Sequence, residues 1–403
     1  MISLSGRSGF RLRPGLLAAA LAMLATSASA APMSAGAYQS VLGDCEGCHG
    51  KNLAGGVALM TPFGKLVTPN ITPDKQTGIG NYTAEDFRRA MKEGVAPRGK
   101  RLYPAMPYPA YARMSDADIA SLWAYMRTVK PVRQAVKVNH LKFPFSIRFL
   151  MRGWNMLFFQ PANVTPAAGK SAAWNRGAYI VMGPAHCGTC HTPKNFFGAD
   201  RGMALSGASL QGWLAPDLTS ERTTGLGSWS SDELMEYLKT GRNRYSIASG
   251  PMAEVVEHST TKMTDTDLQA VSVYLKDLPP SAGNGGGATG AEAQMKSGAG
   301  IYRMNCAACH SLDGKGDEIL FPALAGNPLV RQTSPETLAR VVLAGSRGAA
   351  TSAAPTGPGM PSFAWKLNDA QVADVLTYIR NNWGNSAPAV SARDVRKIKF
   401  SLR

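Results

Sequence analysis

The clearest hydrophobic pattern in the chain is a polar start followed by apolar residues at intervals of three and four, and it occurs three times. Ser115, Thr264 and Asn368 begin these stretches, and acidic residues follow each of them. Such side chains cap the first turn of a helix, and acids there meet the positive end of its dipole. The pattern predicts three amphipathic closing helices, whose apolar residues are Ile119, Leu122, Trp123 and Met126, then Leu268, Val271 and Leu275, then Val372, Val375, Leu376 and Ile379.

Two more helices are predicted ahead of each closing helix. The middle helix has a Ser or Thr start followed by acids, and it ends at a glycine. An opening amphipathic stretch occupies 35–44, 174–185 and 295–305, and each contains a Gly-x-Tyr triplet. We predict that the triplets hold equivalent places, where the small residue lets another helix approach closely. The middle helices run from Thr83 to Gly94, Ser231 to Gly241 and Ser334 to Gly345, and the triplets are Gly36-Ala-Tyr38, Gly177-Ala-Tyr179 and Gly300-Ile-Tyr302.

All six cysteines lie in a Cys-x-x-Cys-His pentapeptide that occurs once per copy: Cys45, Cys48 and His49, then Cys187, Cys190 and His191, then Cys306, Cys309 and His310. This is the attachment signature of a c-type haem, in which both thiols bond the porphyrin and the histidine ligates iron. A zinc site is the alternative, but Cys₂His supplies three ligands where structural zinc takes four. A disulfide within each pair explains neither the histidine nor the triplication. We therefore predict three covalently bound haems c and no disulfide.

A methionine is predicted to fill the sixth iron position in each copy. One lies among prolines or glycines between the middle and closing helices of each: Met106, Met252 and Met360. Proline stiffens such a loop, and thioether ligation raises the reduction potential. His258 is the rival ligand to Met252, whereas His140 and His186 have no counterparts and are predicted to be surface or packing residues. Irons with six ligands leave no open position for a substrate, which favours an electron relay over a catalyst.

These patterns predict an all-α chain of three tandem cytochrome c domains, each a few helices around one haem. Strand patterns are scarce, and the haem supplies the apolar centre that so small a domain lacks. The predicted organisation is a signal peptide at 1–30, domains at 34–131, 169–280 and 293–385, an apolar and basic connecting segment at 132–168, a Gly-rich linker at 281–292 and a basic tail at 386–403.

The chain is basic, with 43 Lys and Arg against 27 Asp and Glu. The basic residues are scattered and no aromatic-basic motif accompanies them, which argues against nucleic acid and favours an acidic partner or an anionic membrane surface. Arginines at 7, 11 and 13, an apolar run at 16–24 and the small residues 28–30 resemble a secretory signal peptide. The apolar run is short for a membrane anchor. We therefore expect cleavage after Ala30 and a periplasmic location, because c-type haems are attached outside the bacterial cytoplasm.

Residues 141–160 form the most apolar stretch after the signal peptide. Lys142, Pro144, Arg148 and Arg152 argue against a transmembrane helix. The apolar residues that follow Pro144 are predicted to share one helical face: Ile147, Leu150, Met151, Trp154 and Phe158. Packing across the first two domains or insertion into a groove of a partner is favoured, and an interfacial membrane helix is the alternative. The tail after Asn385 is expected to be a basic, weakly ordered extension that could touch a partner or lipid.

At the level of longer motifs the sequence resembles the tri-haem cytochrome c subunits of bacterial membrane-bound dehydrogenase complexes, such as those that oxidise alcohols, gluconate, sorbitol, fructose or aldehydes. The resemblance covers 34–390. It rests on residues 70–80 (NITPDKQTGIG), 102–111 (LYPAMPYPAY), 143–148 (FPFSIR), 238–243 (LKTGRN), 250–255 (GPMAEV), 324–328 (LAGNP) and 383–385 (WGN).

The resemblance implies a role rather than a reaction. A separate large subunit with a pyrroloquinoline quinone, flavin or molybdenum cofactor oxidises the substrate, and a small subunit is a further partner. This chain would pass the electrons through its three haems to ubiquinone at the outer face of the inner membrane, with Met106, Met252 and Met360 in the places of the axial ligands. Relatives commonly carry a C-terminal membrane-associating segment, where this chain has a short basic end.

Three other functions compete with this interpretation. A haem enzyme, such as a peroxidase or reductase, would need an iron with an open site. A subunit of a terminal oxidase would be expected to carry a transmembrane anchor. A free periplasmic electron shuttle would stay monomeric in a soluble extract.

Overall fold

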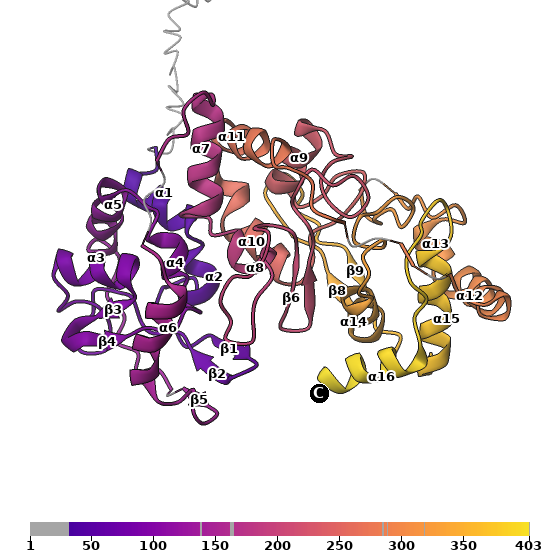
Figure 1. Cartoon of the computed structure of the whole chain (residues 1–403), viewed down its shortest axis with the longest axis horizontal. Helices are drawn as coiled ribbons and strands as arrows, with labels where there is room; N and C mark the ends of the chain where they lie inside the picture. Colours follow the sequence, from indigo (N-terminus) through magenta and orange to yellow (C-terminus); the bar gives the residue numbers. More distant parts are fainter. Residues whose placement is uncertain are drawn as a thin grey trace, which may run out of the picture. The chain divides into compact units, whose positions relative to one another are not determined.

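The computed structural model of the chain is mainly helical (Figure 1). It describes residues 32–137, 139–161, 165–283, 286–287, 289–317 and 319–402. The predicted signal peptide and part of the predicted Gly-rich linker lie outside these ranges. One compact unit begins at Ser34, and its division into three domains stays a prediction.

Within this unit a three-helix pattern recurs, and each recurrence is called a module: module 1 (34–131), module 2 (169–280) and module 3 (292–402). In each, the opening and middle helices both contact the closing helix or its neighbours, as Figure 1 shows for α7 and α11. The opening, middle and closing helices are α1 (Ala35–Leu42), α3 (Ala84–Glu93) and α5 (Asp116–Met126), then α7 (Ala172–Met182), α9 (Ser231–Thr240) and α11 (Asp265–Lys276), then α12 (Glu292–Asn305), α14 (Glu336–Ala344) and α15 (Asp369–Arg380). Shorter helices between the middle and closing ones are η1 (Pro97–Gly99), α4 (Tyr108–Tyr111), α10 (Pro251–His258) and η3 (Thr260–Lys262).

Local capping explains why the helices begin where they do. The side chains of Thr83, Ser115, Thr264 and Asn368 accept backbone hydrogen bonds at their helix starts, as predicted. Two starts differ from the prediction by one residue. Ser230 rather than Ser231 caps α9, in a capping box with Glu233, and Pro335 rather than Ser334 holds the cap position of α14. In the second case a proline takes the place of the capping side chain.

Short strands accompany the helices, so the prediction of an all-α fold is not confirmed in that detail. A three-stranded antiparallel sheet has the order β1-β2-β5, and three two-stranded ladders pair β3 with β4, β6 with β7 and β8 with β9. Strands of two to four residues are too short to show an alternating pattern in the sequence. Their bounds are β1 (Ala58–Thr61), β2 (Gly64–Val67), β3 (Val95–Ala96), β4 (Lys100–Arg101), β5 (His140–Leu141), β6 (Ala208–Leu210), β7 (Trp213–Ala215), β8 (Ser346–Arg347) and β9 (Gly359–Met360).

A glycine in each opening helix makes room for the closing helix of the same module. A Cβ atom at Gly36 would lie 2.0 Å from a backbone oxygen of α5, and one at Gly177 would lie 1.9 Å from a backbone oxygen of α11. In module 3 the matching position is Gly298, where a Cβ would lie 2.2 Å from the backbone oxygen of Asp374. Gly300 has open space around it. The predicted equivalence of Gly300 with the first two glycines is therefore wrong, because α12 meets α15 one half-turn earlier.

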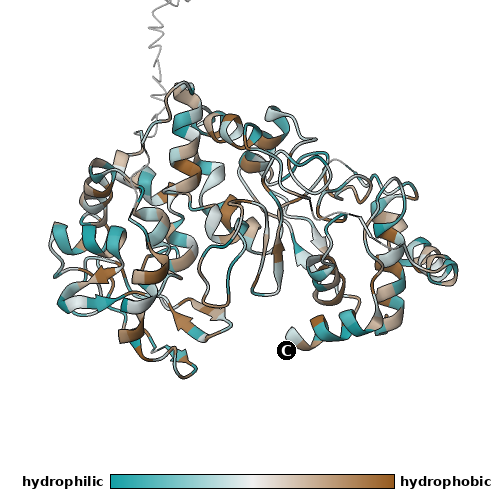
Figure 2. Ribbon diagram, in the orientation of Figure 1, coloured by the Kyte–Doolittle hydropathy of each residue, from teal (hydrophilic) through white to brown (hydrophobic). Residues whose placement is uncertain are grey.

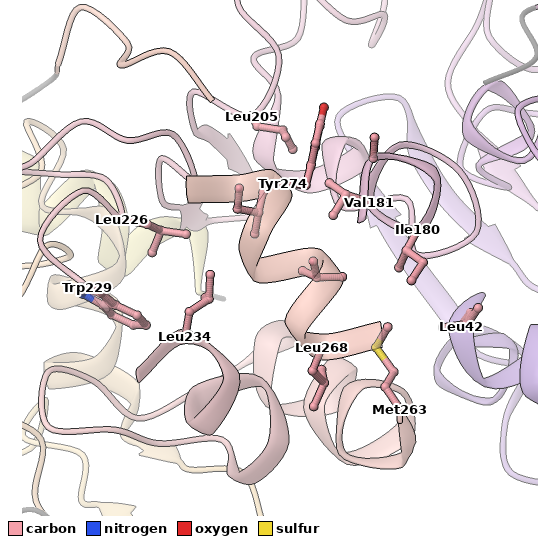
Figure 3. Close-up of a cluster of buried hydrophobic side chains, with 13 residues drawn as sticks. Leu42, Ile180, Val181, Leu205, Leu226, Trp229, Leu234, Met263, Leu268 and Tyr274 are labelled. Atoms are coloured by element: carbon pink, nitrogen blue, oxygen red, sulfur yellow. The ribbon is translucent and has the colours of Figure 1, made fainter. Parts of the chain in front are cut away.

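Buried apolar side chains cluster where the three helices of a module meet. In module 2 the cluster lies around α11 and includes Leu268, Val271 and Leu275, with Ile180 of α7 and Leu234 of α9 (Figure 3). Leu42 of module 1 joins the same cluster. The predicted apolar faces of the closing helices are thus the core faces.

Module 3 is completed by a helix where a weakly ordered basic tail was predicted. α16 (Ala392–Ser401) begins at a capping box between Ser391 and Asp394. Val395 is fully buried against α14 and α15, while Arg396 and Lys399 both pair with Asp369 at the start of α15. The prediction of weak order is wrong, because the apolar positions of this tail lie at helical spacing between its cations.

The connecting segment forms η2 (Arg148–Leu150) and α6 (Met151–Phe158), and β5 pairs with β2 of module 1. Met151 is buried, whereas Ile147 and Leu150 are exposed, so the predicted single apolar face is only partly correct. None of the helices in the described ranges has the length and apolar character needed to cross a bilayer.

Candidate haem sites

Each Cys-x-x-Cys-His motif is placed on a short helical turn that directly follows an opening helix. These turns are α2 (Cys45–His49), α8 (Gly188–His191) and α13 (Ala307–His310). Residues three apart on a helix share a face, so both sulfurs of a pair can reach one porphyrin edge. The two cysteines of each motif are not joined to each other by a disulfide. The arrangement is the one that covalent attachment of haem requires.

A hydrogen bond fixes the ring of each motif histidine in the same way. Nδ1 lies within 3.0 Å of a proline carbonyl oxygen in all three: His49 with Pro69 at 2.8 Å, His191 with Pro216 at 2.7 Å and His310 with Pro322 at 3.0 Å. A carbonyl oxygen only accepts, so Nδ1 must carry the proton and donate it, and Nε2 keeps its lone pair. This tautomer presents Nε2 to a metal, and a backbone partner on the other nitrogen is the usual support of a ligating histidine.

Burial sets the protonation of the motif side chains. It lowers the pKa of His49, His191 and His310, which keeps these imidazoles neutral and able to ligate iron. Burial raises the pKa of Cys45 and Cys187 to about 12. Burial therefore favours the protonated form of both thiols.

The three predicted axial methionines each pack against a buried apolar cluster, and Met106 shares its cluster with a motif cysteine. Met106 and Cys45 pack against one cluster in module 1. Met360 lies in β9 and packs against the core of module 3, and Met252 lies in the first turn of α10. Tyr237 contacts both the cluster that holds Met252 and the one that Cys187 contacts. These positions are compatible with ligation of iron by the three methionines. Their roles as ligands stay predictions.

The rival ligand His258 lies on a different face of α10 from Met252. Met252 and His258 are six residues apart, so their side chains leave the helix axis in directions that differ by about 240°. Ala253 and Val256, on the side of Met252, are buried in module 2. Glu254, one turn before His258, is exposed, and α10 contacts α2 of module 1. Met252 thus packs against a small cluster that Ala349 of module 3 also joins, and His258 lies on another face of the helix.

The other two histidines lie away from the motif cores. His140 is exposed on β5. His186 packs edge to face on Tyr111, with ring centroids 5.5 Å apart, and its Nε2 lies 3.3 Å from the carbonyl oxygen of Gly43. Surface and packing roles are what the sequence predicted for them.

An orphaned buried donor gives an independent indication of a bound group in module 2. Trp229 is 6% exposed, and its indole nitrogen has no hydrogen-bond partner. Its ring stacks on Tyr245, and its cluster also contacts Cys187. A buried N–H without an acceptor is costly, and a haem held by Cys187 brings two carboxylates. The residues present therefore fit the predicted group.

Sequence reasoning missed Trp229 and the three proline carbonyls. In modules 1 and 2 a signal was available, because Pro69-Asn-Ile-Thr72 and Pro216-Asp-Leu-Thr219 repeat the same pattern. Asn70 and Asp217 each accept the backbone N–H two residues on, at 2.9 Å and 2.7 Å, which shapes the turn that aims the carbonyl. In module 3 the segment after Pro322 has a different sequence and carries no such signal.

The chain is similar in sequence to several known proteins. The family model "Cytochrome c" matches residues 35–130 and 295–383. The chain is 41% identical to the cytochrome c subunit of alcohol dehydrogenase (quinone) from Gluconobacter oxydans, over 95% of this chain and 87% of the relative. It is 40% identical to the gluconate 2-dehydrogenase cytochrome c subunit of Pantoea cypripedii (90% and 88% covered). It is 37% identical to the fructose dehydrogenase cytochrome subunit of Gluconobacter japonicus (93% and 84% covered).

Proposed function

The chain belongs to the family of dehydrogenase cytochrome c subunits, and from this we propose that it carries three haems c and passes electrons from a catalytic dehydrogenase subunit to ubiquinone. The observation that carries the proposal is the recurrence of one arrangement in all three modules. Each has a cysteine pair on a helical turn and a histidine whose Nδ1 is bound to a proline carbonyl. A single site of this kind would make a simple carrier, whereas three in one compact unit make a relay.

In this proposal the residues of the chain hold the three haems and keep substrates away from the irons. Cys45, Cys187 and Cys306 with their partners three residues on would bond the porphyrin, and each motif histidine would ligate iron through Nε2. Met106, Met252 and Met360 would complete the coordination. Bound haem supplies one-electron chemistry. With both axial positions filled by protein, electrons would enter and leave while substrates are excluded from iron.

The partner in this proposal is a catalytic subunit that oxidises an alcohol, sugar, sugar acid or aldehyde with a quinone, flavin or molybdenum cofactor, together with a small third subunit. The names of the relatives support this class of partner, since they are subunits of alcohol, gluconate and fructose dehydrogenases. The site of action would be the periplasmic face of the inner membrane, where ubiquinone is accessible.

A haem count tests the attachment sites directly. Replacing Cys187 and Cys190 by alanine should lower the pyridine haemochrome count from three per chain to two. The same replacement in each of the other motifs is the matched control and should give the same result. A count that stays at three in any double variant overturns the assignment of that motif.

Purification in mild detergent from native membranes tests the role. A dehydrogenase subunit should accompany the tagged chain, and added ubiquinone should reoxidise its haems after substrate is supplied. A lone chain in the soluble fraction would support a free shuttle instead. Carbon monoxide binding to the untreated reduced protein would reveal an open iron and support a haem enzyme.

A further inference from the structure

The helix α6 has two faces with opposite surroundings. Its inward face is fixed by hydrogen bonds: the Tyr108 hydroxyl donates to Asn155 at 2.6 Å, and the Trp154 indole donates to the carbonyl oxygen of Phe197 at 2.9 Å. Phe158 stacks on Phe197, with ring centroids 5.8 Å apart. The segment therefore joins module 1 to the 195–198 loop of module 2 and is held firmly in place.

The outward face of α6 is apolar and exposed. Met156 and Leu157 are 82% and 70% exposed, and Phe149 in the preceding turn is 68% exposed. At 100° per residue these three and Arg152 fall within one half of the helix surface, opposite Met151, Trp154 and Phe158. Figure 2 shows hydrophobic colour on and beside α6. Both faces of α6 are therefore apolar, and only the inward one is covered by the rest of the described chain.

More exposed apolar residues surround the same helix. Phe143 is 81% exposed just before η2, and Phe196 is 79% exposed in the loop that α6 contacts. Packing beneath them is aromatic, because Phe63 of the β1–β2 turn lies on Phe145 with ring centroids 4.3 Å apart. We name the exposed set the α6 face; it consists of Phe143, Phe149, Leu150, Met156, Leu157 and Phe196. Apolar patches of this kind on a protein surface usually mark an interaction site.

The sequence segment that contains α6 carries charges of one sign. Residues 119–199 contain ten Lys and Arg and no Asp or Glu. Lys142 and Arg152 are exposed beside the face, and the guanidinium of Arg152 lies 5.6 Å from the ring centre of Phe149. Arg148 donates to the carbonyl oxygen of Arg101 at 2.5 Å and lies over the ring of Tyr103. Carboxylates from outside the segment pair with Lys170, Arg176 and Lys194, whereas Lys142 and Arg152 have no ion pair among the described residues.

We propose that the α6 face docks on the anionic surface of a lipid bilayer. Projecting Phe, Leu and Met side chains would enter the boundary between headgroups and acyl chains, while Lys142 and Arg152 meet lipid phosphates. The exposed cations Lys142 and Arg152 beside the apolar side chains favour an anionic lipid surface over an uncharged protein groove. The inference concerns attachment and stands apart from the proposed electron-transfer role, because it depends on no haem and no dehydrogenase.

Vesicle flotation with the full holoprotein tests the proposal, and the haem absorbance reports the bound fraction. Wild-type protein should float with vesicles of phosphatidylcholine and phosphatidylglycerol, weakly with phosphatidylcholine alone, and less as salt rises. Met156→Gln with Leu157→Gln should weaken partitioning about tenfold or more, since each buried methylene contributes to membrane affinity. Lys142→Gln with Arg152→Gln should reduce only the preference for anionic vesicles.

A control pair comes from exposed apolar residues of module 3. Met304→Gln with Trp365→Gln removes side chains that are as exposed as those of the α6 face, and it should leave flotation unchanged. Met156 and Leu157 are largely exposed, so their replacement should also keep the haem spectrum and melting temperature. Equal flotation of the α6 variant and wild type would overturn the proposal. So would an α6 variant that still floats but no longer co-purifies with a dehydrogenase, which would assign the face to a protein partner.

Discussion

Tyr38 of module 1 donates a hydrogen bond to Asp267 of module 2, with the hydroxyl 2.7 Å from the carboxylate. The contact is reciprocal, because Tyr179 of module 2 donates to Asp118 of module 1. Each tyrosine follows the packing glycine of an opening helix by two residues, and each aspartate occupies the third position of a closing helix. Modules 1 and 2 thus exchange the same contact, as two halves related by an approximate two-fold axis do.

Module 3 lacks both halves of this contact. Gly300 follows its packing glycine by two residues where the tyrosines stand, and Gln371 replaces the aspartate of the closing helix. It contacts module 2 through other groups: the backbone N–H of Leu214 donates to Thr337 at 2.7 Å, and Gln332 donates to the carbonyl oxygen of Thr224 at 2.7 Å. The first two modules therefore form a pair, and the third joins it by an interface of a different kind.

Removing one tyrosine hydroxyl should weaken the pair. Tyr38→Phe keeps the ring and loses a hydrogen bond to a charged acceptor, which should lower the free energy of unfolding by about 1–3 kcal/mol. Tyr378→Phe in α15 is the control, because its hydroxyl makes no hydrogen bond in the described part of the chain. Denaturant unfolding of the holoproteins measures both. A loss of equal size at Tyr378 would show that the effect does not come from the contact between modules.

The same contact should make stability depend on acid pH. Burial opposes the ionisation of Asp267, but hydrogen bonds from Arg176 and Tyr38 more than offset it and hold the pKa of Asp267 below its usual range. Because the pKa of Asp267 is lower in the folded state than in the unfolded state, where it is near 3.9, its ionised form stabilises the fold above about pH 3.9. This stabilisation is lost as the pH falls through the unfolded-state pKa and then the folded-state pKa. The stability difference between wild type and Asp267→Asn should stay constant from about pH 8 to 5 and shrink below about pH 4. A difference that grows on acidification would contradict this assignment.

Local signals in the sequence predicted the helices well, and longer-range relations were harder to see. The capping box of Thr83 and Asp86 lies within four residues, so it is visible without the fold. The proline carbonyls of Pro69 and Pro216 lie 20 and 25 residues after their histidines, so no fixed spacing identifies them. α16 had a signal, because Ser391 and Asp394 precede apolar residues at helical spacing, but the many cations of the tail obscured it.

The packing glycine of module 3 shows why a repeat can be misaligned. The glycines lie nine residues before Cys45 and ten before Cys187, but eight before Cys306, and Gly300 imitates the expected triplet. Gly298→Ala should destabilise the protein by about 1–3 kcal/mol or more, since its Cβ would meet the backbone of α15. Gly300→Ala should be neutral or stabilise by about 0.5–1 kcal/mol, because a helix position with open space favours alanine. Thermal unfolding of both variants decides between the two alignments, and the opposite order of stabilities would restore the original one.

The choice between Met252 and His258 is open to a redox titration. Loss of a thioether ligand should lower one midpoint potential of three, by on the order of 100 mV within the roughly 0.8 V range that axial ligands span. Met252→Ala should therefore shift one potential and leave the haem count at three, and Met106→Ala should do the same for another haem. His258→Ala should leave all three potentials in place. A shift in His258→Ala with none in Met252→Ala would make the histidine the ligand.

The buried indole of Trp229 makes a further prediction about the haem of module 2. Trp229→Phe keeps the stacking on Tyr245 and removes the N–H. If that N–H donates to a haem carboxylate, its loss leaves more negative charge beside the iron and should lower one midpoint potential by roughly 20–60 mV. Trp174→Phe is the control in the same module, because its indole already donates to Asp277 at 2.8 Å, and it should leave the potentials unchanged. Unchanged potentials with a gain in stability for Trp229→Phe would show instead that the donor has no acceptor in the loaded protein.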